Sequence, residues 1–458
     1  MLNRRKKIIT LILMAVYALI IFAPPIYHGY VYPNGGDDTA LHLTIIKSGD
    51  LFKQIYAGYI FVGYPLRWLN ALTGISINWL FFWFNYLVLF MVGVTNSLVA
   101  SKLAGWKAGL LGLFIPAFLT QGIMYQFDFG QVFNIINMGI IFPCLIYFAV
   151  KWYKDRWTYY LYILVGLDLL MATFHSTGVY LAPLILIVVM VNLLYQWAAK
   201  KEIWLAVGNL AVLAPINLVL QYFTMNRFTA DVMQMGLEKG KELPLWFIGK
   251  ILPVTVLIAL GIALIVKRKK YSLQVKVVGV IIGAFAIMLF GVIFFKLSFV
   301  PDRQLYDVVT PIGLIAAILM GRLKAKEFPL AAILVAVTVA GGLPNWFAFH
   351  NAVKEPDKQA FAYLNSLKTG TFSVSSEVTP NIYWNYVKHG YVEEKGDYLV
   401  WRSYPQTACS DPESEAYVPH GADKKDYIIS KTFTDGVVIV NVYWSPKNHN
   451  GTDVVLGY

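Results

Sequence analysis

Long apolar runs separated by short polar segments fill most of the first 347 residues. The first run extends from Ile8 to about Ile26 and follows four basic residues; no small-residue cleavage site is evident and further spans follow, so we interpret it as a retained helix. Ten further runs have roughly the length, about 20 residues, that a helix needs to cross a bilayer. They are 76–99, 106–123, 132–150, 158–174, 178–197, 203–222, 247–266, 272–295, 305–321 and 328–347. The pattern predicts a polytopic α-helical membrane protein with about 11 transmembrane helices.

Basic residues predict the orientation of these helices. If the N-terminus is cytoplasmic, every loop expected inside carries a basic cluster, as the positive-inside rule requires. The clusters are Lys102/Lys107, Lys151/Lys154/Arg156, Lys200/Lys201, Lys267–Lys270 and Arg322/Lys324/Lys326. We therefore expect a multi-pass protein of the plasma (cytoplasmic) membrane.

The segment 56–74 is apolar enough to be another span, but counting it as one would move all these clusters outside. We prefer an amphipathic helix at the outer interface, with Arg67 and Trp68 near the lipid headgroups.

The composition changes at about residue 348, where polar and charged residues return. Lys354–Leu367 predicts a helix with Ala360, Tyr363, Leu364 and Leu367 on one face, and Tyr398–Trp401 and Val437–Tyr443 resemble strands. We expect a membrane module at 1–347, with a first outer loop at 27–75, and a small extracytoplasmic α/β domain at 348–458.

Overall composition excludes the soluble classes. Hydrophobic residues make up 58% of the 458 residues and charged residues 14%, against a usual charged share of about 25%. The net charge of +12 is explained by the basic loops rather than by nucleic-acid binding. Cys144 lies in an apolar run and Cys409 in the polar C-terminal region, so we expect no disulfide framework.

The first outer loop contains the sequence YPNGGDDTALHL at 32–43. Adjacent carboxylates at Asp37 and Asp38 suit either a general base or a divalent metal site. If a helix begins at Asp38, His42 lies on the same face. The same residues also suit a plain helix start, with acids near the positive end of the helix dipole. The two interpretations are compatible.

Other candidate residues are predicted on the same outer side. Asp128 has aromatic and apolar neighbours, which disfavour an isolated carboxylate, although a solvated loop acid is the simpler interpretation. His175 is either a hydrogen-bond donor to an anionic ligand or an interfacial histidine bound to backbone. A metal site requires that the fold bring Asp37, Asp38, His42 and Asp128 close together.

The segment FKLSFVPDRQLYD at 295–307 places two basic residues at a predicted outer helix end. Arg303 suits bidentate phosphate binding, and it can instead pair with Asp302 or Asp307. Lys296 is a second phosphate-binding candidate, or it extends to the headgroups.

The layout resembles the GT-C superfamily of integral membrane glycosyltransferases. The stretch Gly36–His42 is similar to the acidic first-loop motifs of that superfamily, of both Asp-Glu and Asp-x-x-x-His type. The stretch from Tyr64-Pro65-Leu66 to Gly74-Ile75-Ser76 and the helix Glu355-Pro356-Asp357…Tyr363-Leu364 also resemble parts of those enzymes.

This resemblance implies inverting transfer of a sugar from a polyprenyl-phosphate donor to an acceptor glycan, lipid or protein of the cell envelope. Asp37 or Asp38 would be the base or a ligand of Mg²⁺ or Mn²⁺, and the Asp-x-x-x-His alignment, which we prefer, favours Asp38. Arg303 would bind the donor phosphate, with Lys296 and His175.

Three alternatives remain open. A lipid-linked oligosaccharide ligase or polymerase would have a longer late outer loop than 223–246. A secondary transporter or lipid flippase would place acids at mid-membrane, where Asp168 is the one such residue. A membrane-anchored binding protein leaves the Asp37-Asp38 loop without a role.

Overall fold

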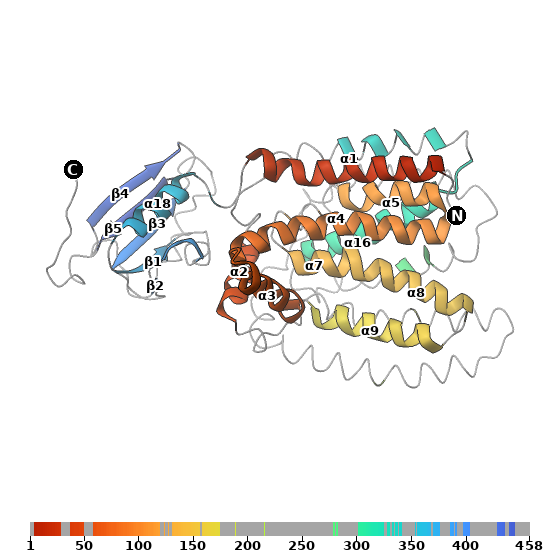
Figure 1. The fold of residues 1–458 in the computed structure, drawn as a ribbon, viewed down its shortest axis with the longest axis horizontal. Coiled ribbons are helices and arrows are strands. Elements are labelled where there is room, and N and C mark those ends of the chain that lie inside the picture. Colours follow the sequence, from red (N-terminus) through yellow and green to blue (C-terminus); the bar gives the residue numbers. More distant parts are fainter. Residues whose placement is uncertain are drawn as a thin grey trace. The chain divides into compact units, whose positions relative to one another are not determined.

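The computed structural model divides the chain into two compact units, shown as parts of Figure 1. Unit 1 contains Met1–Tyr30, Leu51–Pro65 and Trp83–Phe349, and unit 2 contains Val31–Asp50, Leu66–Phe82 and His350–Tyr458. The structure describes residues 4–28, 37–49, 58–119, 131–155, 158–174, 301–324, 355–367, 370–375, 385–388, 390–391, 397–403, 428–435 and 439–444, with a few shorter pieces.

Unit 1 is helical, and three of its described helices are long and apolar enough to cross a membrane. These are α1 (Arg4–His28), α4 (Ile77–Ala104) and the continuous stretch of α7 (Val132–Ile136), η3 (Asn137–Ile141) and α8 (Phe142–Asp155). Shorter apolar helices are α5 (Trp106–Phe118), α9 (Thr158–Phe174) and α16 (Pro301–Met320). Apolar runs therefore predicted the positions of these helices well.

The predicted spans 178–197, 203–222 and 247–266 lie outside the described residues, apart from isolated positions, and only pieces of 272–295 and 328–347 are described. The loops at 200–201 and 267–270 also lie outside them. The total of 11 transmembrane helices stays a prediction.

Helices α5 and α16 pack closely and run antiparallel. A Cβ atom added at Gly313 would lie 3.0 Å from the Pro116 Cα, and one added at Gly321 would overlap the backbone of Ala108. Small residues thus allow the two backbones to approach, as in many membrane helix pairs.

Basic residues from several predicted inside loops gather at one end of unit 1. Lys6 Nζ lies 5.7 Å from the centroid of the Trp106 ring, and Lys107 Nζ lies 4.8 Å from that of Phe328. The Arg322 guanidinium donates a hydrogen bond to the carbonyl of Leu103 at 3.2 Å. The start of α1, the α4–α5 turn and the end of α16 therefore meet. We call this region the basic end.

The described part of the ambiguous segment at 56–74, residues 58–74, is helical up to Thr73. It consists of the five-residue π-helix η2 (Tyr59–Gly63) followed by the ten-residue α3 (Tyr64–Thr73). Trp68 on α3 is 64% exposed. The interpretation as an amphipathic interfacial helix stays a prediction.

Unit 2 contains a five-stranded sheet with the order β2-β1-β3-β5-β4. The strands are β1 (Thr371–Ser375), β2 (Gly390–Tyr391), β3 (Tyr398–Ser403), β4 (Ile428–Thr434) and β5 (Ile439–Trp444). β1 pairs in parallel with β2 and β3, whereas β3–β5 and β5–β4 are antiparallel. β3 and β5 occur at the two runs that the sequence predicted as strands.

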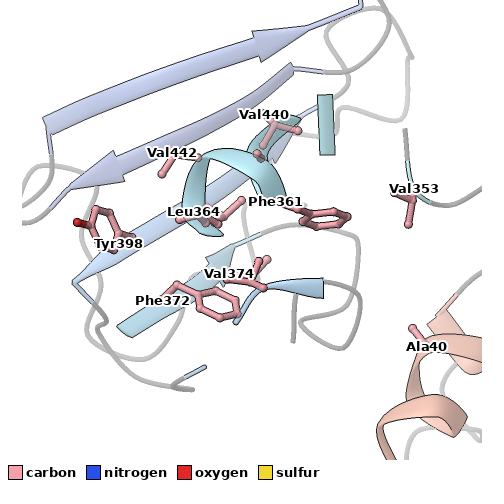
Figure 2. Packing of buried hydrophobic residues seen from close by; sticks show 12 residues of the cluster. Ala40, Val353, Phe361, Leu364, Phe372, Val374, Tyr398, Val440 and Val442 are labelled. Atoms are coloured by element: carbon pink, nitrogen blue, oxygen red, sulfur yellow. The ribbon is translucent and has the colours of Figure 1, made fainter. Parts of the chain in front are cut away.

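The helix α18 (Glu355–Ser366) packs on this sheet, and Figure 2 shows the core between them. Ala360 and Leu364 are buried on the predicted face, but Phe361 is buried too and was not on it. Alternate residues of the strands contribute Phe372, Val374, Val400, Val440 and Val442. The buried cluster also includes Ala40, from the first predicted loop.

Candidate functional site

The acidic pair of the first loop begins a helix. α2 extends over Asp37–Ser48, so both aspartates occupy its first turn. Positions 38 and 42 are four residues apart on this helix and share one face, as predicted. Acidic residues are favoured at this end because the helix dipole is positive there. Both aspartates are therefore held on the first turn of a regular α-helix.

His42 is buried on α2, with 5% of its surface exposed. Among the residues whose side chains are described, no group of three His, Cys, Asp or Glu gathers as a metal site. The side chains of Asp37 and Asp38, and all of Asp128, lie outside that set. The metal site therefore stays a prediction.

Asn385 attaches α2 to the C-terminal part of the chain. Its Nδ2 donates hydrogen bonds to the Ala40 carbonyl at 3.2 Å and to Thr44 Oγ1 at 3.0 Å. Its own carbonyl accepts from Lys47 Nζ at 2.9 Å and from Asn78 Nδ2 of α4 at 3.4 Å. Asn385 is buried, with only 7% of its surface exposed, and takes part in all four of these hydrogen bonds.

α18 holds the short turn that carries Asn385. Asn365 Nδ2 donates to the Tyr386 carbonyl at 2.9 Å, and Asn365 Oδ1 accepts from the Lys388 backbone N–H at 2.6 Å. The Phe361 and Tyr386 rings stack with centroids 5.4 Å apart. The sheet-bearing part of unit 2 thus fixes the turn, and the turn contacts α2.

Arg67 of α3 closes the other end of α2. Its Nη1 donates to the carbonyls of Ile46 and Lys47 at 3.0 and 2.8 Å. Helix ends leave such carbonyls without intrahelical partners, so this contact stabilises the C-terminus of α2. The sequence placed Arg67 near lipid headgroups; in the structure its guanidinium binds the end of the helix that carries Asp37 and Asp38.

Lys47 lies in the last turn of α2 and donates to the Asn385 carbonyl. Burial disfavours its charged form and lowers the pKa of Lys47 to about 8. The link between α2 and the Asn385 turn therefore includes a titratable group.

Arg303 lies in the first turn of α16 in unit 1, and its side chain is outside the described set. One turn later Asp307 is buried, with 3% of its surface exposed. Asn134 Nδ2 of α7 donates to Asp307 Oδ1 at 2.7 Å. The pairing of Arg303 with Asp302 or Asp307 stays a prediction, and His175 and Lys296 lie outside the described residues.

Described neighbours of these residues meet at the end of unit 1 opposite the basic end. Phe174, which precedes His175, packs edge-on against Phe133 with ring centroids 5.7 Å apart. Phe133 is adjacent to Asn134, which binds Asp307. Phe127, which precedes Asp128, packs against Tyr86 of α4, with ring centroids 5.1 Å apart. The end of α9 and the starts of α7 and α16 are therefore close together.

Polar residues also line the interior of the helical unit. Gln131, Asn134 and Asn137 recur at every third position and are buried, and Asn137 Nδ2 donates to the Met171 carbonyl of α9 at 3.1 Å. Asp168 of α9 is buried as well. Polar residues at such depth are often functional in membrane proteins. The three-residue spacing of Gln131, Asn134 and Asn137 within an apolar run was visible in the sequence, but we did not predict a buried polar row from it.

No known protein family profile matches the chain, and no curated protein matches it in sequence. Function is therefore inferred from the residues themselves. Sequence reasoning selected Asp37, Asp38, His42 and Arg303 but missed Asn385 and Lys47. Nothing in the local sequence marks those two, because their contact joins segments 338 residues apart.

Proposed function

We propose that the chain is a membrane glycosyltransferase of GT-C type. It transfers a sugar from a polyprenyl-phosphate donor to an acceptor hydroxyl on the outer face of the membrane, with inversion at the anomeric carbon. The observation that carries the proposal is the mounting of Asp37 and Asp38 on the first turn of α2, a helix fixed by Arg67 and Asn385. A general base requires such a fixed carboxylate.

In the proposed reaction, Asp38, or Asp37 in its place, accepts the proton of the acceptor hydroxyl. The acceptor oxygen forms a bond to the anomeric carbon while the bond from that carbon to the donor phosphate breaks. The polyprenyl phosphate leaves with the electron pair. Arg303, with Lys296 and His175, binds the phosphate and stabilises the charge that develops on it.

The proposal includes a divalent metal. Positions 38 and 42 share one face of α2, so Asp38 and His42 would be ligands of Mg²⁺ or Mn²⁺. When bound, the ion would supply positive charge beside the donor phosphate.

The test uses purified protein in nanodiscs with a panel of polyprenyl-phosphate sugars and envelope acceptors, with and without Mg²⁺ or Mn²⁺. We expect the wild type to consume one donor and Asp38→Asn or Asp37→Asn to lose roughly 10²-fold or more in rate. Glu355→Gln is the matched control, because it neutralises an acid in the first turn of another helix, α18. Wild-type rates in both aspartate variants would overturn the assignment of the base.

A transporter or lipid flippase is the second candidate, because Asp168 and Asp307 are buried within the helical unit. Substrate movement across proteoliposomes without donor cleavage, lost in Asp168→Asn, would favour it. Transfer of an intact oligosaccharide from the same donor panel would instead identify the ligase or polymerase.

A further inference from the structure

A cavity of about 180 Å³ lies at the basic end of unit 1. It opens between the C-terminal ends of α4 and α8. Its walls are Lys102 and Leu103 from α4 and, from α8, Tyr147, Val150, Lys151 and Lys154. The four α8 residues have the spacing i, i+3, i+4, i+7, which places them on one face of the helix.

The lining combines positive charge with an apolar wall. Three of the six lining residues are lysines, and the Arg322 guanidinium lies against the same stretch of α4 through its hydrogen bond to Leu103. Asp155 offsets part of this charge, because its carboxylate lies 3.5 Å from Lys151 Nζ. The excess of positive charge favours an anion, and the side chains of Leu103 and Val150 favour a ligand with an apolar portion.

The position and size of the cavity restrict the ligand further. α4 and the α7–η3–α8 stretch are two of the three candidate membrane spans, and the cavity lies where both end. Headgroups lie at that depth of a bilayer. The volume is below the about 300 Å³ of ordinary small-molecule sites, so it suits a single phosphate group better than a nucleotide.

An anion in this cavity must be bound by lysine side chains rather than by backbone N–H groups. Both helices present their C-termini here, where backbone carbonyls carry partial negative charge and repel anions. Backbone N–H groups, the usual phosphate ligands at helix N-termini, point away. Affinity for an anion should therefore depend strongly on Lys102, Lys151 and Lys154.

We propose that this cavity binds the phosphodiester headgroup of an anionic membrane phospholipid. Lys102, Lys151 and Lys154 contact the phosphate, and Leu103 and Val150 face the upper part of the acyl chains. None of the residues of the proposed transfer reaction is among the described residues that line this cavity.

The test measures lipid retention by native mass spectrometry after release from nanodiscs that contain phosphatidylglycerol, cardiolipin or only phosphatidylcholine. Lys151→Gln/Lys154→Gln removes two lining charges, and Lys102→Gln removes the charge contributed by α4. Lys107→Gln/Lys324→Gln is the matched control, with two basic residues of the same end outside the cavity. Monodisperse elution and an unchanged unfolding temperature establish that each variant is folded.

We expect one anionic lipid to be retained by the wild type and by the control, with apparent affinity lowered roughly 30-fold in Lys151→Gln/Lys154→Gln and about fivefold in Lys102→Gln. Equal loss in the control would show diffuse attraction and overturn the site. Displacement of the lipid by millimolar inorganic phosphate or ATP would assign the cavity to a soluble phosphate instead. Equal retention of phosphatidylcholine would also overturn the proposal.

Discussion

Asn385 and Thr44 are 341 residues apart in the chain and are joined by a hydrogen bond of 3.0 Å from Asn385 Nδ2 to Thr44 Oγ1. The bond connects the turn after β1 to the helix that begins with Asp37 and Asp38. A change in the C-terminal part of the chain can therefore alter the proposed catalytic helix without touching its sequence.

The first prediction concerns this contact. Asn385→Ala removes two hydrogen bonds that Asn385 donates to α2. We therefore expect the free energy of local unfolding of α2 to fall by about 1–3 kcal/mol. Hydrogen exchange of the amides in α2 measures the change, and the rate of donor consumption should fall with it. Asn441→Ala is the control, because Asn441 lies on β5 and bonds to Thr432. Equal protection of α2 in both variants would contradict the prediction.

The second prediction separates steric contact from backbone strain. Gly49 and Gly74 both have positive φ, +82° and +69°, so alanine costs about 1–2 kcal/mol at either site. A Cβ at Gly49 would also lie 2.9 Å from Arg67 Nη1, whereas none of the described atoms lies within 4 Å at Gly74. We expect Gly49→Ala to lower the free energy of unfolding by about 1–3 kcal/mol more than Gly74→Ala.

Adding Arg67→Ala to each glycine variant checks the cause of this difference. Without the guanidinium, the two alanine substitutions should cost the same. A persistent difference between them would point to another neighbour of Gly49.

The third prediction concerns the buried pair of Asn134 and Asp307. Because both side chains are buried, replacing Asn134 with leucine leaves a carboxyl group without this donor, and we expect a loss of about 1.5–3 kcal/mol in unfolding free energy. A double-mutant cycle with Asp307→Leu, which removes the acceptor, measures the coupling in detergent. A coupling energy near zero would show that the 2.7 Å contact contributes nothing to stability.

The fourth prediction is a pH dependence due to Lys47. The unfolded chain holds this proton up to the ordinary pKa of 10.5, whereas the folded chain releases it near pH 8. The unfolded state therefore binds more protons between these values, and stability should rise with pH across that window. Lys47→Met should lack this rise, measured as unfolding free energy at several pH values. The surface variant Lys358→Met is the control and should follow the wild type.

The fifth prediction tests the sidedness expected from the basic loops. The two cysteines of the chain are Cys144, half-buried in α8, and Cys409, in the C-terminal region expected outside the membrane. A membrane-impermeant maleimide should label intact cells through Cys409, and Cys409→Ser should abolish the label. Labelling that requires cell lysis would place the C-terminal region inside and reverse the proposed orientation.

The sequence predicted those elements whose signal is local. Apolar length located α1, α4 and α9, and the change of composition preceded a sheet whose strands β3 and β5 were recognisable. The start of α2 was also predictable, because Gly-Gly-Asp-Asp before an apolar stretch is a helix start in its own right.

Contacts between distant segments were not predictable in this way. Asn385 and Lys47 meet across 338 residues, and neither has an unusual local sequence. Arg67 was recognised as a basic residue on an amphipathic helix, but only the fold shows that the carbonyls of Ile46 and Lys47 are its partners. Phe361 was missed because Ala360, Tyr363, Leu364 and Leu367 already formed a plausible apolar face.

The bond between Asn134 and Asp307 also has a consequence for synthesis. The two residues are 173 positions apart, so a ribosome adding about 5–20 residues per second makes Asp307 roughly 10–35 s after Asn134. During that interval the Asn134 amide must be satisfied by water or by another helix, because hydrocarbon offers it no partner. A chain that ends before residue 301 keeps this temporary state permanently. In the proposed membrane topology, insertion of the early helices therefore precedes their final packing, and translation of α16 sets when that packing is completed.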